Sequence, residues 1–260
     1  LAANMPLEVT TFRTESTYSD ARHPDAVQFV SSIEADLSRR DFTINAMAYD
    51  PLKKRLVDPF AGRSDLTNQT IRCVGQPADR FAEDPLRILR AVRFCSQLGF
   101  VISPETMAAA QASLAGVSGI ARERISTEFC KTLAGSNLAV AINIPFFSSL
   151  LLHVFPSFVD EQSTNRIATS ILPLFRAALP HFAAHRERAA TTLQNRSAGD
   201  DSPSTSLMIL SLLLHVFKQD GCAVVLAKIA SDLRLSKRAM TELTRIMKGA
   251  RVLSPPDHTV

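Results

Sequence analysis

The hydrophobic pattern predicts short extended segments near the start of the chain. Residues 7–13 alternate β-branched and polar side chains, which is typical of a strand, and residues 14–25 are polar enough to predict a loop. From residue 38 to 49 the apolar positions follow a helix-like repeat, so we expect a helix capped by Ser38. A small sheet with few helices is therefore expected in this part of the chain.

Short elements follow, and then the pattern becomes helical. Residues 56–60 and 71–74 predict strand or turn elements around a bend at Gly62. After Pro77 the apolar spacing is helical, with punctuating glycines and one polar interruption at residues 194–205. The expected helices cover residues 79–98, 104–115 and 126–133. The predicted fold class is therefore α+β, mostly α.

One uncharged segment resembles a membrane span in composition. Residues 138–159 contain no Asp, Glu, Lys or Arg, but they include Pro145 and Pro156. A proline inside a helix removes a hydrogen bond and clashes with the preceding turn, so two prolines argue against a spanning helix. We expect a buried helix–turn–helix here and no membrane association.

Composition narrows the class of protein further. The 260 residues are 46% hydrophobic and 21% charged, with only 9 Gly, which excludes a wholly disordered or collagen-like chain. The four cysteines are far apart and form no CxxC pair, so neither a zinc site nor a disulfide framework is expected. Residues 1–10 carry Glu8 and no basic segment, which does not fit a signal peptide. These features predict a cytoplasmic location.

The net charge of +4 permits an anionic partner. Between residues 228 and 251 there are seven basic residues against Asp232 and Glu242. A basic helical segment of this kind suits an RNA phosphate backbone, and Lys237, Arg238 and Arg245 are its candidate contacts. A solvated helix face is the alternative, and charge alone favours it.

The first candidate binding cluster is the segment Arg39-Arg40-Asp41, followed by Asn45. Two guanidinium groups at the expected start of a helix would combine planar, bidentate donors with the positive end of the helix dipole. Such an arrangement could hold phosphate groups. On spacing alone, an ion pair that caps an amphipathic helix explains it better.

The second cluster is Asp84, Arg87 and Arg90, which are spaced three apart and would share one face of a helix. A carboxylate beside a guanidinium offers an acceptor next to donors. This pattern complements the pairing edge of cytosine or adenine, whereas uracil and guanine would place a carbonyl against the carboxylate. Leaving such buried groups unpaired costs roughly 1–3 kcal/mol each. The alternative is a helix stabilised by individually weak ion pairs.

The third feature is Glu8 in the expected opening strand. A carboxylate on a strand can ligate Mg²⁺ during phosphoryl transfer, because Mg²⁺ prefers hard oxygen ligands. Glu8 alone is weak support, since a two-metal site needs further carboxylates and no Asp-x-Asp precedes it.

Taken in order, several words of the sequence closely resemble the tRNA nucleotidyltransferase/poly(A) polymerase family, in its bacterial class II branch. They span about the first 135 residues and read LEVTTFR, YSDARHPDAVQFV, DLSRRDFTINAMAYDP, VDPFAGRSDL, IRCVGQPADRFAEDPLRILRAVRF and ARERISTEF. The resemblance implies part of a nucleotidyltransferase head at residues 1–62, a helical neck at 63–135, and a helical body and tail at 136–260.

The resemblance also assigns roles to residues. Glu8 matches a catalytic carboxylate, and Asp84 with Arg87 matches the pair that selects CTP and ATP in place of a template. The segment that holds the ribose and triphosphate of the nucleotide corresponds to Arg39, Arg40, Asp41 and Asn45. The last neck motif, thought to support the selecting helix, corresponds to Arg122, Glu123, Arg124 and Glu128.

Two departures from the family pattern matter. The family's opening Gly-Ser turn and Asp-x-Asp are not in this sequence, so we expect an N-terminally truncated chain that holds the nucleotide-selecting half of the site without its principal metal ligands. Residues 207–217 resemble the HD segment of some relatives, but Val216 follows His215 where an Asp would bind metal. A nucleotide-sensing hydrolase built on that segment is therefore disfavoured.

The implied activity is template-independent addition of CMP and AMP to the 3′ end of tRNA from CTP and ATP, with Mg²⁺ as cofactor. A poly(A) polymerase, or one partner of a split CC-adding and A-adding pair, would share the same motifs. A non-catalytic RNA-binding remnant is a rival of another class. The intact words around Arg40 and Asp84 argue against that remnant.

Overall fold

The structure is a computed structural model that describes residues 10–16, 26–29, 31–158, 230–237 and 240–241. The chain forms two compact units. The first comprises Leu1–Arg87 and Val101–Ser113, and the second comprises Ile88–Phe100 and Leu114–Val260. Within the described ranges, no helix has the length and apolar character needed to cross a membrane.

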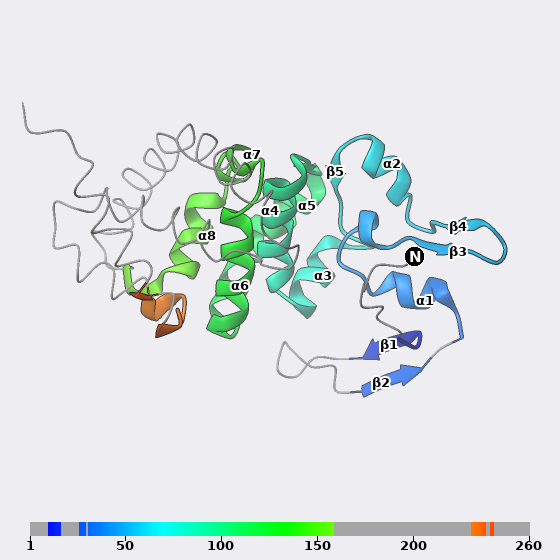
Figure 1. The fold of residues 1–260 in the computed structure, drawn as a ribbon, viewed down its shortest axis with the longest axis horizontal. Helices are drawn as coiled ribbons and strands as arrows, with labels where there is room; N and C mark the ends of the chain where they lie inside the picture. The colour runs from blue at the N-terminus through cyan, green and yellow to red at the C-terminus, as the bar shows by residue number, and fades with distance from the viewer. Residues whose placement is uncertain (1–9, 17–25, 30, 159–229, 238–239, 242–260) are drawn as a thin grey trace, which may run out of the picture. The chain divides into compact units, whose positions relative to one another are not determined.

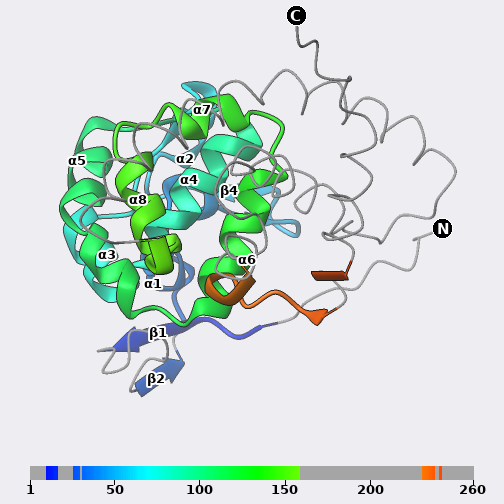
Figure 2. The same ribbon diagram turned by 90° about the vertical axis from the view of Figure 1, so that its left-hand side faces the viewer.

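The first unit combines short strands with short helices (Figure 1). Among its described residues the strands form three pairs: β1 with β2 and β3 with β4 are antiparallel, whereas β5 and β6 are parallel. Figure 2 shows β1 and β2 lying side by side. In chain order its elements are β1 (Arg13–Ser16), β2 (Ala26–Phe29), α1 (Ile33–Ser38), the 3₁₀ helix η1 (Thr43–Asn45), β3 (Ala48–Asp50), β4 (Arg55–Val57), α2 (Gly62–Thr67), β5 (Thr70–Ile71), α3 (Pro77–Glu83), β6 (Val101–Ile102) and α5 (Pro104–Ala112).

A small apolar cluster packs the first unit together. Leu37 from α1, Ala46 after η1 and Val74 after β5 are buried in it. Partly buried apolar side chains from α1 and the β3–β4 hairpin pack against this cluster. The burial of these side chains anchors the turn that follows α1, which carries the first candidate cluster.

The second unit is built from helices in the described ranges, and α4 enters it from the first unit. Its elements are α4 (Leu86–Leu98), η2 (Leu114–Gly119), α6 (Arg122–Leu133), α7 (Leu138–Ile142), α8 (Phe147–Val154) and η3 (Pro156–Phe158). Phe129 of α6 meets Phe155 edge-to-face, with ring centroids 5.3 Å apart. The predicted buried helix–turn–helix is confirmed by α7 and α8, and the predicted helix-rich fold class with small strand pairs is confirmed as well.

The predicted helix over residues 38–49 is wrong. Ser38 ends α1 and does not cap a new helix, and the residues after it form η1 and then β3. The reason is a long-range pairing of backbone: Thr43 N donates to Arg72 O at 2.9 Å and Val74 N donates to Asp41 O at 3.1 Å. Pairing with a distant segment replaces the local helical hydrogen bonds.

The predicted strand over residues 7–13 is misplaced in its described part. Residues 10–12 are irregular, strand β1 begins at Arg13 and runs to Ser16, and residues 7–9 lie outside the described part. The polar segment predicted as a loop therefore contributes three residues to β1, because its register pairs Thr14 with Gln28 on β2. Polar side chains are tolerated in a two-stranded antiparallel ribbon, which the alternation rule does not detect.

The single helix expected over residues 79–98 is two helices, α3 and α4. Asp84 breaks it, with φ −144° and ψ 97°, because the ring of Pro85 disfavours the helical conformation in the residue before it. The region expected to be a purely helical neck also contains the β5–β6 pair. Helices α5 and α6 overlap their predicted ranges, and the division into head, neck and body stays a prediction.

Candidate nucleotide site

Arg39 and Arg40 follow the C-terminal end of α1, so the expectation that they lie at a helix start is wrong. Both side chains bind the buried carboxylate of Asp36, one turn earlier. Arg39 Nη2 lies 2.7 Å from Asp36 Oδ1, and Arg40 Nη2 lies 3.0 Å from Asp36 Oδ2. The helix dipole at this end favours cations, so it stabilises the two arginines and does not attract phosphate. Asp36 thus fixes the two guanidinium groups as a pair.

Asp41 and Asn45 form the next turn. The Asp41 carboxylate is buried, and its Oδ1 accepts a hydrogen bond from Phe42 N at 2.9 Å and from Asn45 Nδ2 at 3.1 Å. Asp41 therefore holds the 3₁₀ turn closed from its start. In this structure, Asp41 and Asn45 contact each other.

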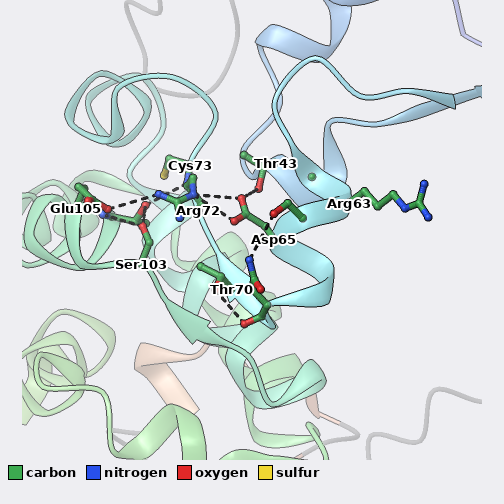
Figure 3. A network of polar contacts seen from close by, with 12 residues as sticks. Thr43, Arg63, Asp65, Thr70, Arg72, Cys73, Ser103 and Glu105 are labelled. Atoms are coloured by element: carbon green, nitrogen blue, oxygen red, sulfur yellow. Dashed lines mark hydrogen bonds and ion pairs between the residues drawn. The ribbon is translucent and has the colours of Figure 1, made fainter.

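A network of polar side chains from α2 and from the segment after β5 contacts this turn (Figure 3). Thr43 Oγ1 donates to Asp65 Oδ2 at 2.7 Å, and Arg72 Nε donates to the same carboxylate at 3.2 Å. Arg72 also lies 3.6 Å from Glu105 on α5. Asp65 is buried in α2, so the two donors compensate its desolvated charge. The network ties η1 to α2 and to the segment after β5.

Helix α2 can approach η1 closely because it begins with Gly62. A Cβ added to Gly62 would lie 2.2 Å from the carbonyl oxygen of Thr43 and 2.9 Å from Met47 Cγ. Asp58 holds the same end of α2, since its carboxylate accepts from Gly62 N at 2.7 Å and from Arg63 N at 3.0 Å. The segment VDPFAGRSDL, residues 57–66, therefore packs against the turn that follows Arg39 and Arg40.

Asp84 lies in the break between α3 and α4, not within one continuous helix. Its Oδ1 accepts a hydrogen bond from Leu86 N at 3.1 Å, and the Asp84 carbonyl accepts from Arg87 N at 3.0 Å. The side chain is half-buried. The expected i,i+3 face from Asp84 is thus replaced by a carboxylate that caps the start of α4.

Three hydrogen bonds hold the buried guanidinium of Arg87. Its Nη1 lies 2.9 Å from Glu83 Oε2 and 3.3 Å from the Arg80 carbonyl, and its Nη2 donates to the Arg39 carbonyl at 3.2 Å. Arg80 Nη1 likewise donates to the Ser38 carbonyl at 3.3 Å. The structure therefore brings the Asp84–Arg87 segment against the end of α1, where the double-arginine pair begins.

Arg90 lies one turn further along α4, and its guanidinium carbon is 5.7 Å from the centroid of the Phe94 ring. This is a cation–π contact within the helix. It falls in the second unit, whereas Asp84 and Arg87 belong to the first. A nucleotide contact by Arg90 stays a prediction.

Glu128 contacts α4, and its predicted role in supporting a nucleotide-selecting helix stays a prediction. Glu128 of α6 is buried and lies 2.9 Å from Arg93 Nε of α4. Arg122, at the start of α6, donates to the carbonyls of Asp232 at 3.0 Å, of His153 at 2.9 Å, and of Val154. Partial burial lowers the pKa of Arg122. Arg124 is half-buried in the same turn.

Several candidate residues lie outside the described part of the chain. Glu8, Arg238, Arg245 and the HD-like segment at 207–217 are among them, whereas Lys237 is described and exposed. Within the described ranges, no group of three or more His, Cys, Asp or Glu side chains could hold a metal ion. The described residues alone therefore do not form the Mg²⁺ site that the family resemblance implies.

Three acidic residues matter to this site although sequence reasoning assigned them no role. Asp36 pairs the two arginines, Glu83 holds Arg87, and Asp65 holds Thr43. Glu83 lies four residues before Arg87 and Asp36 lies four before Arg40, so i,i+4 spacing was an available signal. The Asp65 contact spans 22 residues and had no local signal.

Comparison with known proteins supports the family resemblance noted in the sequence. A family model described as the poly A polymerase head domain matches residues 1–72, and one described as a probable RNA and SrmB-binding site of polymerase A matches residues 99–161. The chain is 48% identical over 168 residues to the CCA-adding enzyme of Bacillus subtilis, covering 65% of this chain and 42% of that protein. It is 53% identical over 137 residues to the CCA-adding enzyme of Enterococcus faecalis, covering 53% and 34%.

A solved structure agrees with the sequence relatives. The crystal structure of the Bacillus stearothermophilus CCA-adding enzyme in complex with CTP is 27% identical, with a TM-score of 0.66, and the match covers 96% of this chain and 53% of that one. The chain spans less than half the length of the two curated relatives above. The family resemblance noted in the sequence is thereby confirmed.

Proposed function

This chain belongs to the tRNA nucleotidyltransferase/poly(A) polymerase family, and from that premise we propose that it serves the addition of CMP and AMP to the 3′ end of tRNA in the cytoplasm. In this reaction the RNA 3′-hydroxyl attacks the α-phosphate of CTP or ATP. The bond from the α-phosphate to the bridging oxygen breaks, and pyrophosphate leaves. The relatives named above carry the same activity in their names, and one solved structure holds CTP.

The observation that carries the proposal is the hydrogen bond from Arg87 to the Arg39 carbonyl. It joins the segment that would read the base to the segment that would hold the sugar and phosphates, within one compact unit. Base selection and phosphate binding must lie within the length of one nucleotide, and this contact satisfies that requirement. Glu83 fixes the Arg87 guanidinium, so the donors are oriented before the nucleotide arrives.

The division of labour follows from charge. Arg39 and Arg40 would bind the triphosphate, because their planar guanidinium groups match phosphate oxygens and Asp36 holds the two groups side by side. Asp84 and Arg87 would accept from and donate to the pairing edge of cytosine or adenine. Asp41 and Asn45 would shape the turn that meets the ribose.

The proposal includes Mg²⁺, which activates the attacking hydroxyl and neutralises phosphate charge in reactions of this class. Glu8 is the ligand that the sequence assigns within this chain, and it lies outside the described residues. The actions assigned to Arg39, Arg40, Asp84 and Arg87 are binding and orientation, which these residues would perform without ligating the ion.

Nucleotide binding by the chain tests the selection step directly. We expect CTP and ATP to bind more tightly than UTP and GTP in equilibrium titrations. Equal affinity for all four nucleotides would contradict the assigned roles of Asp84 and Arg87.

A second experiment separates the alternatives within the family. A tRNA that lacks its terminal CCA is incubated with each nucleotide, and the products are sequenced. Addition that stops after CCA supports the proposal, whereas a long A tract would identify a poly(A) polymerase. Addition of only CC or only A would identify one partner of a split system.

A further inference from the structure

The turn that joins β3 to β4 is exposed and carries basic and apolar side chains together. Leu52 at the turn is 94% exposed, Tyr49 is 61% exposed and Leu56 is 43% exposed. Figure 1 shows the β3–β4 hairpin extending past α1 and α2 of its own unit, with the turn at the outer end. The roles assigned above to the first unit do not use these side chains.

The turn has a defined conformation. Asp50 Oδ1 accepts hydrogen bonds from Leu52 N at 3.0 Å and from Lys53 N at 3.1 Å, which closes an Asx-type turn. The hydrogen bond from Lys53 N contributes most to holding the pKa of Asp50 below its usual value, and the bond from Leu52 N adds to it. Lys54 adopts the left-handed conformation, with φ 48°. The tip therefore presents its side chains from an ordered backbone.

The two faces of the hairpin differ. Ala48 pairs with Val57 across the strands, and both pack on the apolar cluster around Leu37. Tyr49 pairs with Leu56 and faces the opposite way, because successive side chains on a strand alternate between faces. The exposed aromatic and aliphatic pair is thus not explained by packing within the first unit.

The tip is also positively charged. Lys53, Lys54 and Arg55 are consecutive and exposed. Within residues 48–57 these three cations stand against one acidic residue, Asp50, giving a net charge of +2. The Asp50 carboxylate accepts hydrogen bonds from turn N–H groups at the base of the tip. The hairpin therefore combines a cationic edge with an exposed aromatic ring.

We infer that the β3–β4 hairpin tip is a contact surface for the RNA substrate, in which Lys53, Lys54 and Arg55 bind backbone phosphates and Tyr49 packs on a ribose or base. This inference rests on the proposed function, because it takes RNA as the substrate. Cations that track a phosphate backbone beside an aromatic side chain that stacks are the recurring features of RNA-binding surfaces. The surface supplies RNA affinity and takes no part in nucleotide selection.

An anionic membrane is the other partner that basic and apolar side chains could fit. A single myristoyl chain already gives only marginal membrane binding. The hairpin offers Leu52 with the partly exposed Tyr49 and Leu56, and these side chains present less apolar surface than such a chain. RNA is therefore the partner that this surface fits better.

The test compares two variants in which the same amount of charge is removed. Lys53→Ala removes one cation from the tip, and Arg63→Ala removes one exposed cation elsewhere in the same unit. Binding of a tRNA transcript that lacks CCA is measured by fluorescence anisotropy over a range of salt concentrations. We expect the tip variant to bind less tightly than the control variant. Its log–log salt slope should become shallower by about 1 for each phosphate that the tip no longer binds.

Tyr49 provides an independent arm of the test. Tyr49→Ala should weaken tRNA binding about fivefold or more, whereas Tyr49→Phe should retain it, because stacking needs the ring and not the hydroxyl. Thermal unfolding of each variant verifies that the substitution of an exposed side chain leaves the chain folded. Equal decreases in the affinity of the tip and control variants, or no decrease in either, would overturn the inference.

Two further results would also overturn it. One is failure of the unaltered chain to bind the tRNA. The other is unchanged tRNA binding by the tip variant together with abolished binding to phosphatidylserine vesicles. Nucleotide preference is measured on the same samples, so the proposed function and the RNA contact at the hairpin tip are tested by different measurements. A chain that binds tRNA through the tip but does not prefer CTP and ATP contradicts the proposed function and supports this inference.

Discussion

The guanidinium of Arg87 donates a hydrogen bond to the main-chain carbonyl of Arg39 across 3.2 Å. These two residues are 48 positions apart in the sequence, and each belongs to a different candidate cluster. The contact gives physical content to the idea that one part of the chain reads a base while another holds its phosphates. Four sets of variants and one chemical modification probe the surrounding structure.

Asp84→Asn should change nucleotide preference without unfolding the chain. An asparagine can still accept the hydrogen bond from Leu86 N that Asp84 accepts now, so the start of α4 is kept. It replaces a carboxylate oxygen by an NH₂ donor, which would meet the carbonyl of uracil or guanine favourably. We expect the preference for CTP and ATP over UTP and GTP to fall by a factor of about 5 or more, from roughly 1 kcal/mol per mispaired group.

Equilibrium titration with the four nucleotides measures that preference. Asp79→Asn, at an exposed aspartate in α3, is the matched control and should behave like the unaltered chain. Asp84→Ala should likewise relax the choice while tRNA affinity stays near normal. An unchanged preference in both Asp84 variants would contradict the selecting role.

Gly62→Ala should destabilise the first unit. The new Cβ would lie 2.2 Å from the Thr43 carbonyl oxygen, so α2 and η1 would have to separate. Overpacking of this kind costs about 1–3 kcal/mol in the free energy of unfolding, which urea denaturation measures. Gly119→Ala is the control, because a Cβ there meets no atom within 4 Å. If both variants unfold at the same urea concentration, the close approach at Gly62 is not a constraint.

Glu128→Ala should reduce the stability of the second unit. The variant leaves the Arg93 guanidinium, only 12% exposed, without its carboxylate partner at 2.9 Å. Removing one member of a buried ion pair costs about 3–5 kcal/mol. The double variant Arg93→Met/Glu128→Leu removes both charges and should recover much of that stability. Denaturant unfolding of the three proteins decides the matter, and a double variant no more stable than Glu128→Ala would refute the ion-pair explanation.

Neutralising Lys237, Arg238 and Arg245 to alanine should weaken tRNA binding and flatten its salt dependence. The log–log salt slope should fall by about 1 for each phosphate that these side chains bind in the unaltered chain. A charge-retaining variant, Lys237→Arg/Arg238→Lys/Arg245→Lys, should bind like the unaltered chain. Unchanged affinity in the alanine variant would mean that this basic segment is solvated surface.

Cys73 and Cys95 should resist alkylation while the chain is folded. Burial raises the pKa of Cys73 to about 11 and that of Cys95 to about 12. The thiolate is the reactive species, so at pH 8 only about 1 in 1000 Cys73 side chains is reactive. Raising the pH should increase the reaction of Cys73 with iodoacetamide about tenfold per unit up to pH 11. Mass spectrometry of the labelled peptides measures this, and equally fast labelling in folded and urea-unfolded chain would contradict it.

The local sequence pattern was sufficient to predict helices whose hydrogen bonds form within the same segment. Helix α5 begins after Ser103, whose hydroxyl accepts from Thr106 N, and α6 buries an apolar face that includes its own Ile125 and Phe129. The break between α3 and α4 had a local signal as well, since Pro85 restricts Asp84, but the prediction of one continuous helix overlooked it. The family words around Arg39 and Asp84 located the candidate site for the same reason, because they are contiguous in the chain.

Tertiary contacts determined the conformation of residues 41–46 and the partner of Arg87, which local sequence pattern does not predict. Residues 41–46 form a 3₁₀ turn because their backbone pairs with residues 72–74, and this places Arg39 and Arg40 after a helix end. The partner of Arg87 is a main-chain carbonyl, which carries no side-chain signature at all. The sequence by itself determined which residue types stand in the two candidate clusters. Long-range backbone pairing and the packing of α2 on η1 decided which of them meet, because those contacts depend on the distance between atoms in space and not on spacing along the chain.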